Sequence, residues 1–324
     1  MPEIRPVASQ QHAEALELLF RDHTPEERRQ QVEELLADMR PGDVSGEGLL
    51  GAHRGGRLVG VVLAQVQPGR TAAVWPPRVA DGEPDATADR LLAAATDWLS
   101  ARQDVCLAQV LMPLGARDDA ARLRAHRFVH LADLLYLVSL EIEFPEVDVS
   151  AAEKTKKGPG LFCGKTNQVP FSLQFEPCAD PSDSRLAAIV EASYEGTLDC
   201  PLLNGVRQIG DVLEGYRAGG VFHPNLWLIA SHAGRDVGCL ILSDHPRHGN
   251  LELVYMGVLP AWRGCGWGGQ LARKAQWLAR QLGRPRLVLA VDAANQPAVD
   301  VYVAVGFQAW DRRRAMVRLF QPTA

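Results

Sequence analysis

The feature of this sequence that most constrains its fold is a repeat with a constant offset of 179 residues. The matching positions fall in expected strands and helices rather than in turns alone. Because the period has the length of a whole domain, it predicts two copies of one α/β unit instead of a solenoid of short repeats. The matching pairs are His53 and His232, Leu92-Ala93 and Leu271-Ala272, Trp98-Leu99 and Trp277-Leu278, and Phe128 and Phe307.

The length of 324 residues agrees with about two domains. Four of the five lysines lie between Pro145 and Pro170, in a stretch that is also rich in Gly, Ser and Thr. Such a change of composition is typical of a linker. The sequence therefore predicts a first domain over residues 1–145, a linker over 146–170 and a second domain over 171–324.

Strand and helix signals alternate in both halves. In the first half, Thr24-Pro25-Glu26-Glu27 is a capping box with proline at the first helical position, and Val32, Leu35, Leu36 and Met39 follow at helical spacing. In the second half, residues 226–232 and 237–244 are expected to form a hairpin, and 250–258 a further strand. The pattern predicts an α/β (α+β) protein.

A glycine-rich loop follows the expected strand 250–258 and opens a helix. Glycines let the backbone approach a ligand closely, and the amide groups at a helix N-terminus attract an anion. The spacing Gly264-x-Gly266-x-x-Gly269, with Asp292 ending the next strand, also fits a dinucleotide-binding unit. Five residues between strand and first glycine, and only 55 residues after Gly269, weigh against that alternative. The predicted ligand-binding residues of the loop are Arg263, Gly264, Cys265, Gly266, Trp267, Gly268 and Gly269.

Two motifs together resemble the GNAT superfamily of N-acetyltransferases. Pro260 followed by Arg263-x-x-Gly266-x-Gly268 is similar to its pyrophosphate signature, and Asn295-x-x-Ala298-x-x-x-Tyr302-x-x-x-Gly306-Phe307 to its second motif. The resemblance covers about residues 171–320 well and the first half in outline. It implies two tandem domains, each a mixed, mostly antiparallel twisted sheet flanked by helices, with acetyl-CoA as co-substrate and no metal. It also implies that the backbone near Met256 and Val258 pairs with pantetheine, that Asn295 lies at the cofactor site, and that Gly257 forms a bulge.

The resemblance also implies catalytic roles for Glu252 and Tyr302. A carboxylate on a strand is a firmly placed acceptor for the proton of an attacking amine, and a phenol near the thioester sulfur can protonate the leaving thiolate. The alternative interpretations are a solvated glutamate at a strand edge and a tyrosine that only packs in the core. The expected reaction is direct acetyl transfer to a primary amine in a ternary complex.

The first copy lacks these residues. At the repeat offset, the glycine loop becomes Pro84-Asp-Ala-Thr-Ala-Asp-Arg90, and acids at a helix start repel a pyrophosphate. Glu252, Asn295, Tyr302 and Gly306 correspond to Ala73, Ala116, Leu123 and Arg127. The sequence therefore predicts that the first domain is a degenerate, inactive copy.

Composition limits the other function classes. The net charge of −5 argues against a nucleic-acid-binding surface, and no apolar run is long enough for a membrane helix. The six cysteines have no CxxC spacing, which predicts neither a zinc site nor a disulfide framework, and no signal peptide opens the chain, so a cytoplasmic location is expected. Cys265 at a helix start favours a thiolate, but a covalent role is not expected.

The acceptor is the least constrained part. The segment with Glu195, Asp199, Cys200 and Asn204 is expected to shape its pocket, and its acids favour a small-molecule or peptide amine. The segment Asp244-His245-Pro-Arg-His248 is interpreted as a solvated hairpin turn instead of a metal site. A non-catalytic acyl-CoA-binding or interaction protein is the competing hypothesis.

Overall fold

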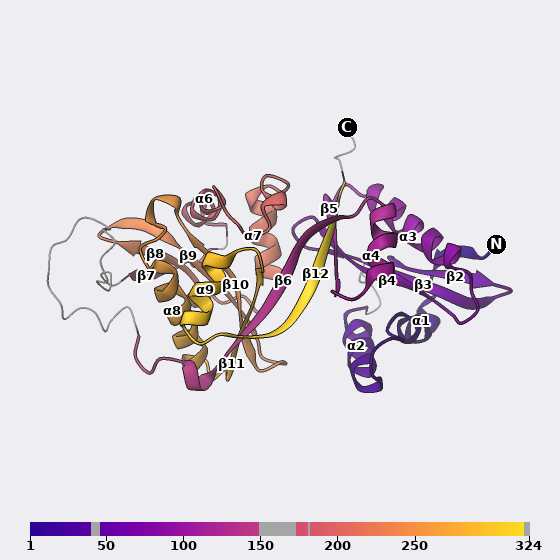
Figure 1. Cartoon of the computed structure of the whole chain (residues 1–324), viewed down its shortest axis with the longest axis horizontal. Helices are drawn as coiled ribbons and strands as arrows, with labels where there is room; N and C mark the ends of the chain where they lie inside the picture. Colours follow the sequence, from indigo (N-terminus) through magenta and orange to yellow (C-terminus); the bar gives the residue numbers. More distant parts are fainter. Residues whose placement is uncertain (40–45, 149–172, 181, 321–324) are drawn as a thin grey trace. The chain divides into compact units, whose positions relative to one another are not determined.

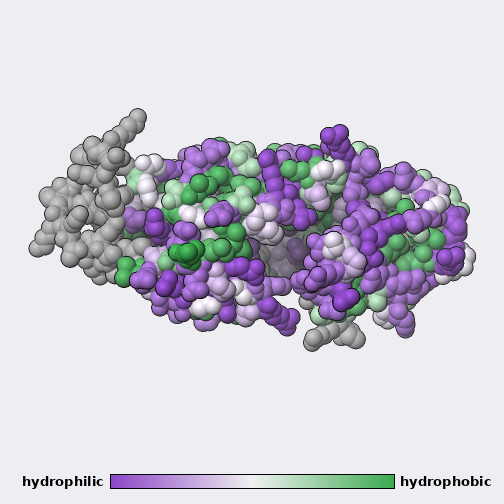
Figure 2. Space-filling model, turned by 60° about the horizontal axis from the view of Figure 1, so that its bottom comes forward, coloured by the Kyte–Doolittle hydropathy of each residue, from purple (hydrophilic) through white to green (hydrophobic). Residues whose placement is uncertain are grey.

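The computed structural model describes residues 1–39, 46–148, 173–180 and 182–320. The chain forms two compact units: unit 1 comprises Met1–Leu131 with Arg314–Ala324, and unit 2 comprises Ala132–Arg313. Residues 149–170 of the expected linker lie outside the described part of the chain. No helix within the described ranges is both long and apolar enough to cross a membrane. The face shown in Figure 2 is mainly hydrophilic, and hydrophobic residues form smaller groups on it.

Unit 1 is a sheet with helices on both faces (Figure 1). Strands follow in the order β1-β2-β3-β4-β5, and every neighbouring pair is antiparallel except β4 and β5. The bounds are β1 Glu3–Pro6, β2 Leu49–Arg54, β3 Arg57–Gln67, β4 Thr71–Val79 and β5 Leu107–Pro113 for the strands, and α1 His12–Leu19, α2 Pro25–Asp38, α3 Asp85–Ser100 and α4 Arg117–Ala125 for the helices.

The hydrophobic core of unit 1 has two parts, one on each face of its sheet, because side chains alternate between the faces along each strand. Leu50 and Val62 pack in one cluster with α3, whereas their neighbours Leu49 and Val61 pack in the other cluster with α1 and α2. Successive strand residues point to opposite faces, so each strand serves both layers. The predicted capping box of α2 is confirmed, because the Thr24 side chain accepts a hydrogen bond from the Glu27 amide and the Glu27 carboxylate accepts one from the Thr24 amide.

Unit 2 has the same architecture. Its strands follow in the order β6-β11-β10-β9-β8-β7, and α6 and α8 both pack on β9 and β10. Central strand β9 is therefore buried at every position from Val237 to Asp244. The bounds are β6 Val129–Leu140, β7 Gln174–Pro177, β8 Trp227–His232, β9 Arg235–His245, β10 Asn250–Val258 and β11 Arg286–Asp292, and α6 Ser184–Ser193, α7 Ile209–Ala218, α8 Trp267–Gln281 and α9 Gln296–Ala304.

The two halves of the sequence exchange a strand. Residues 134–140 of β6 pair antiparallel with β11, and Leu137, 1% exposed, packs in the core of unit 2. Conversely, the end of β12 (Gln308–Leu319) lies beside β5 in unit 1, where Met316 is fully buried and the Phe320 amide donates to the Cys106 carbonyl at 2.8 Å. The predicted boundaries 1–145 and 171–324 describe the two copies in the sequence and stay a prediction. The compact units have other bounds, because β6 and β12 are exchanged between the two halves.

The structure reproduces the sequence repeat closely. Both bounds of β4, β5, α4 and β6 differ by 179 from those of β10, β11, α9 and β12. The parallel ladders also agree, since Thr71 faces Leu107 in unit 1 and Asn250 faces Arg286 in unit 2. The repeat therefore extends from sequence to strand register.

Candidate active site

The glycine loop joins β10 to α8 in unit 2. After a short 3-10 turn, Pro260–Trp262, Gly264 and Gly266 adopt positive φ angles of 77° and 79°. Gly266 is the N-cap of α8, which has no side-chain cap and no acidic residue in its first turn. The first amide groups of a helix have no partner within the helix, so this uncapped end is suited to an anion.

Arg263 holds the loop in place. Its guanidinium donates to the carbonyls of Ser193 and Glu195 at 2.7 Å each, and to that of Val258 at 3.1 Å. Ser193 is the last residue of α6, where unpaired carbonyls carry partial negative charge. The side chain thus fastens the loop to α6 and to the end of β10, and its expected contact with a ligand stays a prediction.

Three elements converge where α8 begins. A Cβ atom built on Gly268 would lie 3.5 Å from the side chain of Val301 on α9 and 4.0 Å from that of Met256 on β10. Trp267 is buried beside His232, with ring centroids 5.0 Å apart, and its Nε1 has no hydrogen-bond partner. No atom within 4 Å would meet a Cβ at Gly269, so that side of the helix start is open.

Strand β10 separates from β11 partway along its length. The parallel pairing runs only from Asn250 to Glu252, opposite Arg286 to Val288. On its other side β10 stays paired with β9, where Met256 faces Leu240 and Val258 faces Gly238. The backbone of β10 beyond Glu252 is therefore outside the β11 ladder.

The expected bulge at Gly257 is wrong in position. The register shifts between Leu253 and Tyr255, which leaves Val254 as the extra residue. Gly257 is needed for packing instead, because a Cβ there would lie 2.5 Å from the Ser193 hydroxyl oxygen. Absence of a side chain at this position lets α6 approach β10.

Glu252 forms a hydrogen-bonded pair with His245. The Nε2 atom of His245 lies 2.8 Å from a Glu252 carboxylate oxygen, and the two side chains are 19% and 38% exposed. This hydrogen bond raises the pKa of His245. His245 faces Asn250 across the hairpin, so Glu252 is its diagonal neighbour on the same face.

The interpretation of residues 244–248 as a solvated turn is wrong for the first two. Strand β9 continues through His245, and Asp244 is buried and bonded to Arg284 at 2.6 and 2.9 Å. The signal that the sequence offered was the hairpin itself, which places His245 and Glu252 on one face. Within the described residues, no cluster of His, Cys, Asp and Glu is suited to a metal ion.

Tyr302 lies on α9 and is 6% exposed, with its ring at 5.4 Å from that of Phe307. Burial raises its pKa well above the ordinary value, and the charge of Asp199 adds to the shift. The shift therefore favours the neutral phenol, which can donate a hydrogen bond. Asn295 caps α9 as predicted, because its side chain accepts from the Ala298 amide at 3.4 Å.

The predicted acceptor segment contains a carboxylate close to Tyr302. Asp199 accepts a hydrogen bond from the Asp292 amide at 2.9 Å. Its side chain is open to solvent, yet desolvation by the surrounding protein raises its pKa. The next residue, Cys200, has a left-handed backbone with φ of 45°, and burial raises the pKa of its thiol to about 12.

Further aromatic residues of unit 2 belong to no motif in the sequence. The ring of Tyr255 stacks on that of Tyr216 at 5.5 Å, and its hydroxyl lies 2.7 Å from that of Ser193. Tyr136 on β6 has its pKa raised mainly by burial, with a smaller contribution from the charge of Glu252, and contacts Trp310 on β12. No motif near Tyr136 predicts that it lies in unit 2, because its position depends on the pairing of β6 with β11 from the other half of the sequence.

Cys265 corrects the expectation from cysteine spacing. It is disulfide-bonded in the structure, so its sulfur is not a thiolate at the start of α8. The described cysteines that are free thiols are Cys106, Cys178, Cys200 and Cys239.

The corresponding turn of unit 1 is acidic. Helix α3 begins after Pro84 without a side-chain cap, and Asp85 lies in its first turn. Glu83 accepts from the Thr87 hydroxyl at 2.6 Å and pairs with Arg54 at 2.7 Å. These carboxylates surround the place where unit 2 has its glycine loop, and acids there disfavour an anionic ligand.

Comparisons with known proteins match part of this chain. Residues 204–307 match the acetyltransferase (GNAT) family. A mycothiol acetyltransferase of Pseudarthrobacter chlorophenolicus is 37% identical over 95 residues, which is 28% of this chain and 29% of that protein. One from Thermobifida fusca is 38% identical over 60 residues, which is 18% of this chain and 19% of that protein. The chain thus matches less than a third of the length of these relatives.

Solved structures extend the likeness to both units. A GCN5-related N-acetyltransferase from Sphaerobacter thermophilus has a TM-score of 0.62 at 15% identity, over 99% of this chain and 96% of its own. A tandem GNAT protein from the clavulanic acid biosynthesis pathway has a TM-score of 0.51 at 16% identity, over the full length of both chains. Likeness at this identity concerns the fold. The chain therefore has the fold of two tandem GNAT-like domains, and its segment 204–307 matches the GNAT acetyltransferase family.

Proposed function

We propose that the protein is an acetyl-CoA-dependent N-acetyltransferase with one active site in unit 2, acting on a primary amine. One observation carries the proposal. Strand β10 bears Glu252 where its pairing with β11 ends and leads at its other end into the uncapped glycine loop of α8. Six residues separate Glu252 from Val258, or about 20 Å of extended strand. An elongated ligand with an anionic end fits this arrangement.

Acetyl-CoA fits the residues that are present. The positive φ angles of Gly264 and Gly266 form a tight loop before α8, whose first amides have no side-chain cap and whose first turn has no acid to repel a pyrophosphate. The part of β10 outside the β11 ladder, around Met256 and Val258, is where pantetheine would pair with the backbone. Arg263 would act by holding the loop in this conformation.

Direct transfer of the acetyl group requires one side chain that accepts a proton and one that donates a proton. The amine nitrogen attacks the thioester carbon, the carbon–sulfur bond breaks, and the acetyl group moves without an acyl-enzyme. Glu252 would accept the proton that the amine loses, and Tyr302 would donate to the leaving thiolate. Tyr302 carries the proton that this role requires, because a phenol is protonated at neutral pH.

The acceptor is proposed to be a small-molecule amine. Glu252 and Asp199 contribute negative charge at the two sides of the proposed reaction centre, which attracts a cationic amine. Tyr136 supplies an aromatic surface close to Glu252. The relatives named mycothiol acetyltransferase support a small molecule rather than a protein as acceptor.

The test has two stages. Calorimetric titration of the full chain with acetyl-CoA should give one site per chain. A panel of primary amines should then release free coenzyme A thiol in a colorimetric assay, and the product should gain one acetyl group by mass spectrometry. Binding without turnover on any amine would favour a non-catalytic acyl-CoA-binding protein, and absence of binding would overturn the proposal.

A further inference from the structure

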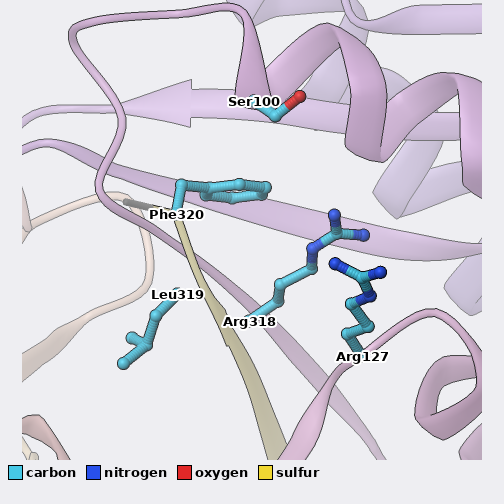
Figure 3. Close-up of a pocket in the computed structure, with 5 residues that line it drawn as sticks. All are labelled: Ser100, Arg127, Arg318, Leu319 and Phe320. Carbon is cyan, nitrogen blue, oxygen red and sulfur yellow. The ribbon is translucent and has the colours of Figure 1, made fainter. Parts of the chain in front are cut away.

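A second site is indicated in unit 1, independent of the acetyl-transfer proposal. We propose that Arg127 and Arg318 form a binding site for a small-molecule oxyanion, a phosphate or carboxylate group attached to an apolar portion. The two guanidinium groups lie next to one another, beside the ring of Phe320 (Figure 3).

The arginines line a hollow of suitable size. It has a volume of about 390 Å³, within the range of small-ligand pockets, and its walls are Ser100, Arg127, Arg318, Leu319 and Phe320. The arginines make one side cationic, whereas Leu319 and Phe320 make another side apolar. Such a combination suits a ligand with one charged end.

Charge around the arginines is unbalanced. Within the described parts of the chain, neither guanidinium forms an ion pair with a carboxylate. Arg318 donates to the His126 carbonyl at 3.0 Å and lies over the Phe320 ring at 5.3 Å. Burial lowers its pKa, and the like charge of Arg127 lowers it further, against an opposing contribution from Asp97. An oxyanion between the two arginines would relieve their repulsion and accept their hydrogen bonds.

The backbone at Arg127 is a second, independent observation. Its φ angle is 65°, in the left-handed region that favours glycine, and its counterpart at the repeat offset is Gly306 with φ of 97°. The turn has therefore been kept while an arginine takes the place of the residue best suited to it. Strained positions of this kind are found where a side chain has a function.

The corresponding place in unit 2 is filled. The counterpart of Arg318 is Ser139, whose hydroxyl accepts from Gln276 at 2.8 Å, and Gln276 also donates to the Val305 carbonyl at 2.8 Å. Next to it, a Cβ on Gly306 would lie 2.6 Å from Glu143. The paired arginines and the hollow are thus specific to unit 1.

The hollow lies at the opposite end of α3 from the turn that corresponds to the glycine loop of unit 2. Ser100 is the last residue of α3, whereas Asp85, at the position of that loop, is the first. A helix of this length spans about 24 Å. The weak negative charge of the helix end is outweighed by two full positive charges.

The experiment is thermal unfolding and calorimetric titration of the full chain at low ionic strength, with inorganic phosphate and with citrate as probes. Saturable binding of either probe is expected, and the probe that binds identifies the anion class. Arg127→Gly should weaken binding at least tenfold while the unliganded protein keeps or raises its unfolding midpoint, because glycine adopts the turn without strain. Arg318→Gln should weaken binding similarly.

Arg124→Gln is the matched control, since Arg124 is exposed on α4 and does not line the hollow. It should bind as the unchanged protein does, and Arg127→Lys should retain part of the affinity. Absence of saturable binding of both probes would overturn the proposal. Unchanged binding in Arg127→Gly and Arg318→Gln would also overturn it, because the anion would then lie elsewhere, for example at the start of α8.

Discussion

The imidazole of His245 and the carboxylate of Glu252 form a hydrogen bond of 2.8 Å between adjacent strands of unit 2. The pair lies where β10 stops pairing with β11, and the hydrogen bond raises the pKa of His245. Other groups near it are Asp244, which also favours the protonated imidazole, and His248, whose ring centroid is 6.3 Å away. The proposed general base thus has a titratable partner at its side.

This pair predicts the pH dependence of the reaction. Once His245 has lost its proton, it can take up the proton that Glu252 receives from the amine, so kcat should rise with pH through the raised pKa of His245, above about 6.5. The variant His245→Gln keeps a side chain that can donate to Glu252 but does not titrate, and should lose this limb of the kcat profile. Superimposable profiles would show that His245 is not in the proton path.

Glu252→Gln should lower kcat by about 100-fold or more, since a positioned general base contributes at least that factor. Calorimetry should show acetyl-CoA binding close to that of the unchanged protein, because the glycine loop is untouched. Glu191→Gln is the control, as Glu191 is exposed on α6 and lies outside the expected acceptor segment. Retention of full kcat in Glu252→Gln would assign the base elsewhere.

Gly266→Ala should weaken acetyl-CoA binding by tenfold or more. A side chain at φ of 79° strains the N-cap of α8 and turns its amides away from the ligand. Gly234→Ala is the matched control, with φ of 74° in an exposed hairpin turn where a Cβ meets no atom within 4 Å. Both variants should lose about 1 kcal/mol of stability, but only the first should lose affinity, and equal affinities would contradict the loop assignment.

Leu137→Ala should destabilise unit 2, although residue 137 belongs to the first half of the sequence. Leu137 is 1% exposed in the core of unit 2 and faces Leu289 across β6 and β11, and truncating such a leucine costs about 3 kcal/mol. Hydrogen exchange should show faster exchange in β10 and β11 than in the unchanged protein, with β2 and β3 little affected. Faster exchange confined to β2 and β3 would contradict the strand exchange.

Arg284→Ala should destabilise the protein by about 2 kcal/mol at neutral pH, because it leaves the buried Asp244 carboxylate without its partner. Arg284 lowers the pKa of Asp244, so this contribution is present above the unfolded pKa of about 3.9 and is lost as the pH falls through the lowered folded value. Urea unfolding at pH 7 and pH 3 should therefore show a smaller difference between variant and unchanged protein at pH 3. A difference that grows on acidification would contradict this account.

Much of the architecture was predictable from local and periodic signals. The repeat offset of 179 residues predicted that β10 and α9 would follow β4 and α4 at that distance along the chain. Four consecutive residues predicted the cap of α2. The loop before α8 was predictable because glycine is the residue that allows positive φ angles, as at Gly264 and Gly266. These features depend on the conformational preferences of neighbouring residues, which the sequence carries directly.

Contacts between distant segments were decided only by the tertiary structure. Placement of Tyr136 close to Glu252 requires β6 to pair with β11, and nothing near residue 136 specifies that partner. The pairing of His245 with Glu252 depends on the hairpin register, and the bulge fell at Val254 and not at the glycine. The sequence by itself determined which residues could do chemistry and on which elements they lie. The tertiary structure decided which of them meet, because strand pairing and burial are set by packing over the whole sheet and not by local preference.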